Sequence, residues 1–288
     1  MRLGMNVQVT GDGLSAMKFL GLCVKVNIPV VRLSLEGAAL STEMQAAMRA
    51  IDMKFYLLPL RMTPQIAAIC LSDWDTWSAM IVTAYANLAF QTAGDDVFKS
   101  DVLAIALPED LHLITRSTNR AGAVGLRREQ VRSFMAQLAK VIRAEGHKVA
   151  LPLRLDDAQG KVYDGLDFDV FDLDCMLSAQ SEETMSQTVV EAALDGSPKP
   201  YWYGRAGMLG GYIVPAQQLR FLRKLETLAR GAEYAFLWSE EASPKWSWSQ
   251  SGATVLDALP QGLRTQGVLV PTGDPAVAHW KAEQRRGK

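Results

Sequence analysis

The chain has almost no net charge and very little cysteine. Its 30 Lys and Arg residues balance 31 Asp and Glu residues, for a formal net charge of −1 over 288 residues. A nucleic-acid binder needs a basic surplus to neutralise phosphates, so we expect no nucleic-acid partner. Cys23, Cys70 and Cys175 are odd in number and far apart, and none belongs to a Cys-x-x-Cys pair. This spacing predicts reduced thiols near the core rather than a disulfide framework.

Long hydrophobic runs are also missing. A membrane-spanning helix needs about 18 or more consecutive apolar residues. The best stretch, 19–31, is interrupted by Lys25 and Pro29, and the stretch 80–90 is too short. The amino-terminal residues read as a strand and a turn rather than as a signal peptide. We therefore expect a soluble chain with no membrane partner that is cytoplasmic at synthesis, and release by lysis or assembly into a phage particle is compatible with this expectation.

Several catalytic signatures are absent. The lone Gly11-Asp12-Gly13 lacks the third glycine of a dinucleotide-binding fingerprint. No G-x-S-x-G sequence is present to form a nucleophile elbow. His112 follows Glu109 by three residues, which would place both on one helical face, but no other His or Cys is close in sequence to complete a metal site. We expect neither a metal nor an organic cofactor.

Short apolar runs do alternate regularly with helical patterns. Eight mostly unbroken runs are typical of parallel strands buried on both faces: 3–9, 29–35, 54–60, 102–107, 148–155, 168–173, 199–204 and 234–239. Apolar residues recur at helical intervals in 73–90, 127–145 and 217–230.

This alternation predicts an α/β fold, a closed (β/α)₈ TIM barrel, with an open doubly wound sheet as the rival. The repeat is short after the second strand. The segment 156–166 leaves little room for a helix, so we expect the barrel to be irregular around its fifth unit. We assign residues 1–262 to the barrel and 263–288 to a C-terminal extension and tail.

Charged and aromatic residues follow many of the predicted strands, where the active site of such a barrel lies. The charged residues are Glu36, Arg61, Glu109, Asp110, Asp156, Asp157, Asp172, Asp174, Arg205, Glu240 and Glu241, and the aromatic residues nearby are Trp202, Tyr203, Trp238, Trp246 and Trp248. Aromatic rings stack on sugar rings, and carboxylates bind hydroxyls or transfer protons, so this combination favours a carbohydrate as the partner. The alternative is that the charges simply pair with one another.

The order and spacing of these segments resemble the clan A glycoside hydrolases, which are retaining enzymes on a (β/α)₈ barrel, and especially their cellulase-like members. The sequences GMNVQV, IPVVRLSL, KPYWYGRAG and AEYAFLWSEE are similar to the first, second, seventh and eighth strands of that clan. The resemblance implies that Arg32 is the arginine of the second strand and that Trp238 is the floor of the sugar site. Glu109 follows the fourth strand, where it would be the acid/base.

Two signature positions differ from the clan. A retaining glycosidase needs a second carboxyl group about 5 Å from the first, as its nucleophile. The resemblance places Arg205 at that position, and a guanidinium cannot attack an anomeric carbon. Its charge would also lower the pKa of a nearby Glu109. The asparagine that precedes the acid/base in the clan is Pro108 here.

Another carboxylate could replace the missing nucleophile. Candidates are Glu240, Glu241, Asp172 and Asp174. A separation of about 6.5–9.5 Å from Glu109 would leave room for a water and permit an inverting reaction.

Two hypotheses about function follow. In the first, the chain is a glycoside-hydrolase-like barrel that binds, and slowly hydrolyses, a β-linked glycan. Glu109 is then the acid/base, and the substrate-binding residues are Arg32, Tyr203, Arg205, Trp238 and Glu240. In the second, the chain is a pseudoenzyme, a non-catalytic glycan-binding or assembly protein such as a phage particle component, in which Arg205 pairs with Glu109. The aromatic residues favour the first hypothesis and the altered nucleophile position favours the second, while no feature of the sequence predicts an oligomeric state.

Overall fold

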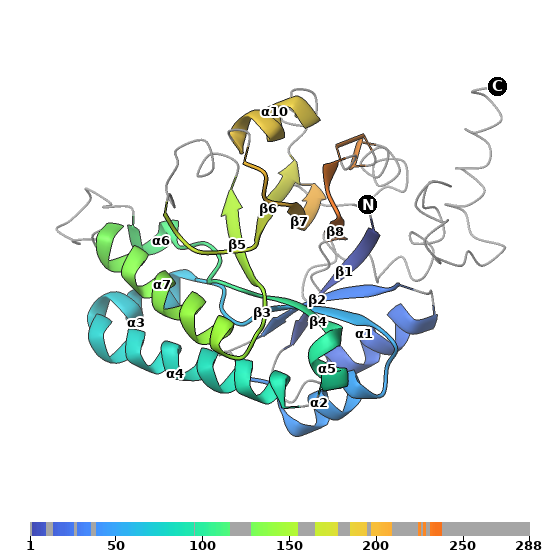
Figure 1. Ribbon diagram of the computed structural model, residues 1–288, viewed down its shortest axis with the longest axis horizontal. Coiled ribbons are helices and arrows are strands. Elements are labelled where there is room, and N and C mark those ends of the chain that lie inside the picture. The colour runs from blue at the N-terminus through green and yellow to red at the C-terminus, as the bar shows by residue number, and fades with distance from the viewer. Residues whose placement is uncertain are drawn as a thin grey trace.

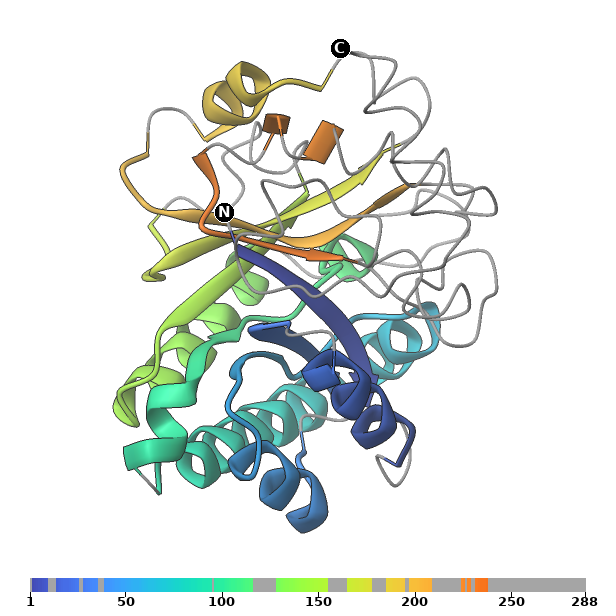
Figure 2. The same ribbon diagram turned by 90° about the vertical axis from the view of Figure 1, so that its right-hand side faces the viewer.

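The computed structural model describes residues 2–9, 14–25, 28–35, 39–94, 96–115, 128–154, 165–177, 185–194, 197–208, 224–225, 227–228 and 231–237. Within these residues eight parallel strands close into a barrel in chain order. They are β1 (Arg2–Val9), β2 (Val30–Leu35), β3 (Lys54–Leu58), β4 (Val102–Ala106), β5 (Val149–Arg154), β6 (Val170–Leu177), β7 (Tyr201–Met208) and β8 (Tyr234–Leu237). The first strand pairs with the last, and Figure 2 shows the dark blue β1 beside the orange strands. The predicted (β/α)₈ barrel is confirmed.

Helices cover the outside of the barrel (Figure 1). They are α1 (Leu14–Lys25), α2 (Thr42–Arg49), α3 (Pro64–Ser72), α4 (Trp74–Ala93), α5 (Asp96–Asp101), α6 (His112–Thr115), α7 (Arg128–Ala144) and α10 (Gln187–Ala193). Side-chain oxygens accept hydrogen bonds from backbone N–H groups at four of these helix starts: Ser41 for α2, Thr63 for α3, Asp73 for α4 and Ser186 for α10. The helices predicted at 73–90 and 127–145 correspond to α4 and α7. The one predicted at 217–230 lies mostly outside the described residues.

The connection between β5 and β6 is described only in part. Residues 165–169 are the described part of this connection, and they contain no helix. The preceding residues 155–164 lie outside the described part, as does the expected domain boundary at 262. Among the residues that the structure does describe, no helix is both long and apolar enough to cross a membrane.

Two apolar layers hold the barrel together. The larger one lies between the strands and the helices and contains the three buried, unbonded cysteines. The smaller one fills the barrel interior with Val30, Tyr56, Leu58, Ala104, Ala106, Ala150, Val170, Trp202, Tyr234 and Phe236. In this layer, ring centroids of Tyr56 and Trp202 are 5.2 Å apart, and those of Trp202 and Tyr234 are 5.1 Å apart. This aromatic packing gives the polar groups above it an apolar floor.

Candidate functional site

Charged side chains from five strands or strand ends meet at the carboxyl-terminal mouth of the barrel. They are Arg32 of β2, Arg61 after β3, Glu109 and Asp110 after β4, Asp172 and Asp174 of β6, and Arg205 of β7. The backbones of Arg61 and Glu109 form a parallel bridge that prolongs the pairing of β3 with β4. The Glu109 N–H donates to the carbonyl of Leu60 at 3.0 Å. The extended sheet therefore fixes the position of Glu109.

Arg32 bridges two buried carboxylates. Its Nη2 atom lies 3.0 Å from Oε1 of Glu109 and 3.0 Å from Oδ2 of Asp172, and its side chain is completely buried. Oε1 of Glu109 and Oδ2 of Asp172 both contact this nitrogen at 3.0 Å, so the two oxygens are at most 6.0 Å apart. The guanidinium lies over the ring of Tyr56, whose hydroxyl donates a hydrogen bond to Oδ2 of Asp172. A cation therefore fills the space between the two carboxylates.

Two more guanidinium groups approach Glu109 from its other side. Arg61 Nε is 3.5 Å from Oε2 of Glu109 and 3.1 Å from Oδ2 of Asp110. Arg205 Nη1 is 3.9 Å from the same Glu109 oxygen, and Arg205 Nη2 pairs with Oδ2 of Asp174. Glu109 is thus surrounded by three cations.

A bulge in β7 directs Arg205 into this network. The register between β6 and β7 shifts after Leu173, so Gly204 is an extra residue between the pairs Leu173–Tyr203 and Asp174–Arg205. A Cβ atom on Gly204 would overlap the carboxylate of Asp172. The carbonyl of Gly204 accepts a hydrogen bond of 2.9 Å from the Asn6 side chain. Glycine is therefore what lets β7 approach Asp172 so closely.

The surroundings shift the two buried carboxyl groups in opposite directions. Burial raises the pKa of Glu109, but the charges of Arg32, Arg205 and Arg61 outweigh this and lower it to about 2. Burial raises the pKa of Asp172, with Arg32 opposing and the negative charge of Glu109 adding to the rise. Glu109 is therefore ionised at neutral pH, whereas the acid of a glycosidase keeps its proton through a raised pKa.

This shift predicts a pH dependence of stability. The pKa of Glu109 is lower in the folded protein than the 4.5 of the free group. Its stabilising contribution is therefore complete above pH 4.5 and is lost as the pH falls toward about 2. The loss should approach about 3 kcal/mol in the free energy of unfolding. Urea unfolding at a series of pH values measures it.

The matched control for this prediction is Glu109→Gln, which cannot titrate at this position. Asp172, whose pKa is raised, contributes a dependence of opposite sign, with stability lost as the pH rises above 3.8. The difference between the two proteins reports the Glu109 step together with its coupling to Asp172, because the charge of Glu109 also raises the pKa of Asp172. If the free energy of unfolding of the native chain and of Glu109→Gln changed in parallel below pH 4.5, the lowered pKa of Glu109 would be contradicted.

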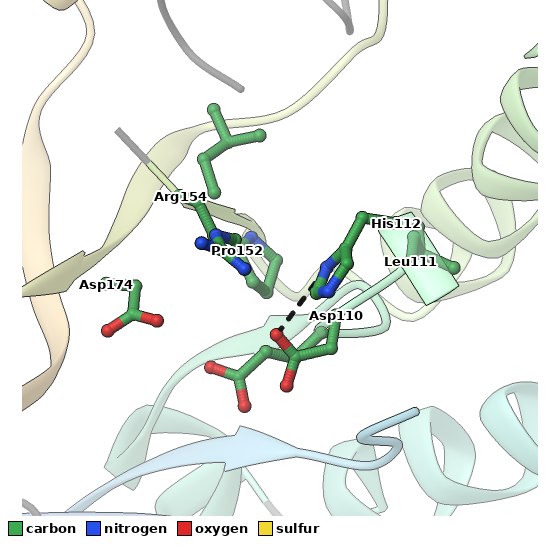
Figure 3. Close-up of a pocket in the computed structure, with 8 residues that line it drawn as sticks. Asp110, Leu111, His112, Pro152, Arg154 and Asp174 are labelled. Carbon is green, nitrogen blue, oxygen red and sulfur yellow. Dashed lines mark ion pairs between the residues drawn. The ribbon is translucent and has the colours of Figure 1, made fainter. Parts of the chain in front are cut away.

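A small cavity lies beside Glu109 (Figure 3). It is lined by Glu109, Asp110, Leu111, His112, Pro152, Leu153, Arg154 and Asp174, and its volume is about 10 Å³. This is near the minimum for one water molecule and far below a sugar ring. Asp110 has a φ of 60° and faces His112, with Oδ1 and Nδ1 3.9 Å apart. No group of three or more potential ligands for a metal occurs in the described part of the chain.

The residues predicted from the sequence separate into three sets. Arg32, Glu109 and Arg205 come together, as described above. Tyr203 is completely buried in the layer outside the barrel, where its hydroxyl donates to the carbonyl of Leu228 at 3.0 Å. Trp238 and Glu240 lie outside the described residues, as do Glu36, Asp156, Asp157, Glu241, Trp246 and Trp248.

Tyr56 and Asn6 also contact this network, and neither is among the residues predicted from the sequence. Asn6 is only 2% exposed and accepts a hydrogen bond of 3.1 Å from Ser34. Both residues lie within predicted strands. A polar side chain inside an otherwise apolar strand was the available signal, because such a group needs a partner when buried.

Comparison with solved structures finds many glycoside hydrolase barrels at low sequence identity. The GH5_18 protein from Streptomyces cattleya in complex with GlcNAc matches with a TM-score of 0.61 and 12% identity, over 98% of this chain and 80% of that one. A GH5 endo-β-1,4-glucanase from Bacillus licheniformis matches with 0.58 and 10%, over 85% and 55%. The β-glucuronidase 2 of Bacteroides uniformis matches with 0.57 and 10%, over 83% and 30%. No protein-family model and no curated protein matches the sequence.

The fold is therefore a (β/α)₈ barrel that is similar to the barrels of these glycoside hydrolases. The chain spans only 30% and 55% of two of these neighbours. At the mouth of this barrel, an arginine of β7 pairs with a carboxylate of β6.

Proposed function

We propose that the chain is a carbohydrate-binding barrel that does not hydrolyse its ligand. The observation that carries this proposal is the set of guanidinium groups around Glu109, in which Arg205 occupies the strand position that the clan resemblance assigns to the nucleophile. Double displacement needs an attacking carboxylate and a protonated acid. A guanidinium at the first position and a pKa of about 2 at the second remove both.

The neighbouring carboxylate Asp172 does not restore the reaction. Its Oδ2 and the Glu109 Oε1 are held together by the same nitrogen of Arg32. In a retaining enzyme the anomeric carbon enters between the two carboxyl groups, and in an inverting enzyme a water does. Here the cation of Arg32 occupies that space, so the pair functions as a structural ion network.

The ligand class is assigned from the fold and its neighbours. The S. cattleya protein is described with GlcNAc and with Manβ1-4GlcNAc, and the B. licheniformis glucanase with cellotetraose. A β-linked glycan is therefore the ligand we propose for this chain. It would bind at the rim above the ion network, because the cavity within the network is too small.

Parallel assays of binding and turnover test this proposal. The full chain is titrated with β-linked gluco-, manno- and GlcNAc-oligosaccharides by calorimetry and incubated with the corresponding aryl β-glycosides, beside an active GH5 glucanase as the positive control. We expect binding to at least one oligosaccharide and no turnover above the buffer blank.

Glu109→Gln separates the two hypotheses further. Turnover by the native chain that disappears in this variant would overturn the non-hydrolytic assignment and support an acid/base role for Glu109. A failure of every oligosaccharide to bind would overturn the carbohydrate assignment.

A further inference from the structure

The outward face of α4 carries almost no charge. Its exposed residues after Asp75 follow helical spacing: Thr76, Ala79, Met80, Thr83, Asn87, Phe90 and Gln91. The large side chains on it are well exposed, with 57% of Met80 and 67% of Phe90 accessible. The charged Asp75 lies in the first turn, where an acid suits the helix dipole.

This composition is unusual for a helix that faces solvent. The outer side of an amphipathic surface helix normally carries charged residues. Here the whole segment 62–98 contains no Lys or Arg. The inner side of α4 is already occupied, because Trp74 and Trp77 pack on Phe134 of α7 at centroid distances of 5.3 and 5.7 Å. In Figure 1, α4 runs along one edge of the molecule with α7 on its inner side.

We propose that this face, the α4 face, binds the same face of a second copy of the chain, with the two helices antiparallel. A two-fold axis at the level of Tyr85 relates position 80 to 90 and position 83 to 87 across the pair. Met80 of each copy then lies opposite Phe90 of the other, which matches a flexible thioether to an aromatic ring. Thr83 lies opposite Asn87, so the polar side chains also meet partners that can hydrogen bond.

The absence of charge favours a second copy over a charged partner. Residues 76–91 contain no Lys, Arg, Asp or Glu, so this part of the face meets no like-charge repulsion when it is paired with itself, and it offers no counter-charge to an acidic or basic surface. Ala79 and Thr83 are small, so they let the two helix axes approach closely. The antiparallel arrangement also places the helix dipoles in favourable opposition.

The size of the face sets the expected strength of the pair. A helix of 20 residues is about 30 Å long. One helix pair of this length buries less surface than a permanent dimer does, so the interface belongs with small transient ones. We therefore expect reversible dimers with a dissociation constant on the order of micromolar.

Sedimentation equilibrium of the full chain over a concentration series up to about 100 µM tests the proposal, since micromolar dimers are well populated there. We expect a monomer–dimer equilibrium in the native chain. Met80→Lys and Phe90→Glu should each weaken dimerisation by at least about tenfold, because each buries an unpaired charge in the interface. The matched control is Val24→Lys, which changes an exposed apolar residue of α1 and should leave the equilibrium unchanged.

The double variant Met80→Lys/Phe90→Glu tests the antiparallel register. In the proposed pair the two new charges face each other across the axis, so dimerisation should recover and become sensitive to salt. Circular dichroism of each variant confirms that the fold is retained. A native chain that stays monomeric at the highest concentration, dimers that tolerate either single change, or a double variant no better than the singles would overturn the proposal.

Discussion

Arg32→Met is expected to destabilise the protein by about 3–5 kcal/mol, the cost of removing one partner from a buried ion network. Arg32 is completely buried, and its Nη2 contacts both Glu109 and Asp172. Without the guanidinium, two carboxylates that lie close together lose the cation between them in the low-dielectric interior. The loss is measured as the change in the free energy of unfolding by urea at pH 7.

Two further variants test the explanation. Arg61→Met removes a side chain that is 39% exposed, so we expect a loss of at most about 1 kcal/mol. The triple variant Arg32→Met/Glu109→Gln/Asp172→Asn removes the stranded charges as well, and it should recover part of the stability lost in the single variant. Equal losses in the free energy of unfolding for Arg32→Met and Arg61→Met would contradict the central role of Arg32 in the ion network. A triple variant less stable than Arg32→Met would show that the unpaired carboxylates are not the source of the loss.

The barrel could be predicted because its strands are buried on both faces. Such strands read as unbroken apolar runs, and eight runs at this chain length fit a closed barrel. Each of the eight predicted runs overlaps one observed strand. The rule that parallel strands end at one mouth of the barrel also identified Glu109, Asp172, Asp174 and Arg205 as neighbours. Topology alone brings these residues together, so no pairwise contact had to be known.

The side-chain directions in β7 could not be predicted from a simple alternation. A strict period of two that places Trp202 inside the barrel would direct Arg205 outward together with Tyr203. The extra residue Gly204 reverses the alternation, so Trp202 and Arg205 both lie inside while Tyr203 packs outside. A glycine within a strand is a known sign of a bulge or of a close approach by another group, and it was the available signal here.

The charge arrangement at the mouth supports the proposal that this barrel binds a glycan without hydrolysing it. In a retaining enzyme the two carboxyl groups have different environments, which separate their pKa values into an acid and a nucleophile. Here too Glu109 and Asp172 have pKa values shifted in opposite directions. The group ionised most readily is Glu109, to which the clan resemblance assigns the acid role, and Arg32 lies between it and Asp172. Under the proposed function, the lowered pKa of Glu109 stabilises the fold instead of preparing a reaction, while the raised pKa of Asp172 opposes part of that gain at neutral pH.

Gly204→Ala is expected to cost about 3 kcal/mol in stability, because the new methyl group would overlap the Asp172 carboxylate. Asp172 cannot move aside freely, since it is held by Tyr56 and by Arg32. The cost should come from this overlap rather than from the backbone, because Gly204 is not among the glycines with positive φ in the described residues. The unfolding free energy measures it.

Gly21→Ala is the matched control for this substitution. No atom lies within 4 Å of a Cβ placed on Gly21, which is inside α1, so alanine there should stabilise the protein by about 0.5–1 kcal/mol. A double-mutant cycle with Asp172→Ala then identifies the source of the cost. Gly204→Ala should be much less damaging in the Asp172→Ala background, because the overlapping oxygens are gone and the two changes act on one contact. Strictly additive effects would show that the close approach of β7 to Asp172 does not limit the residue at position 204.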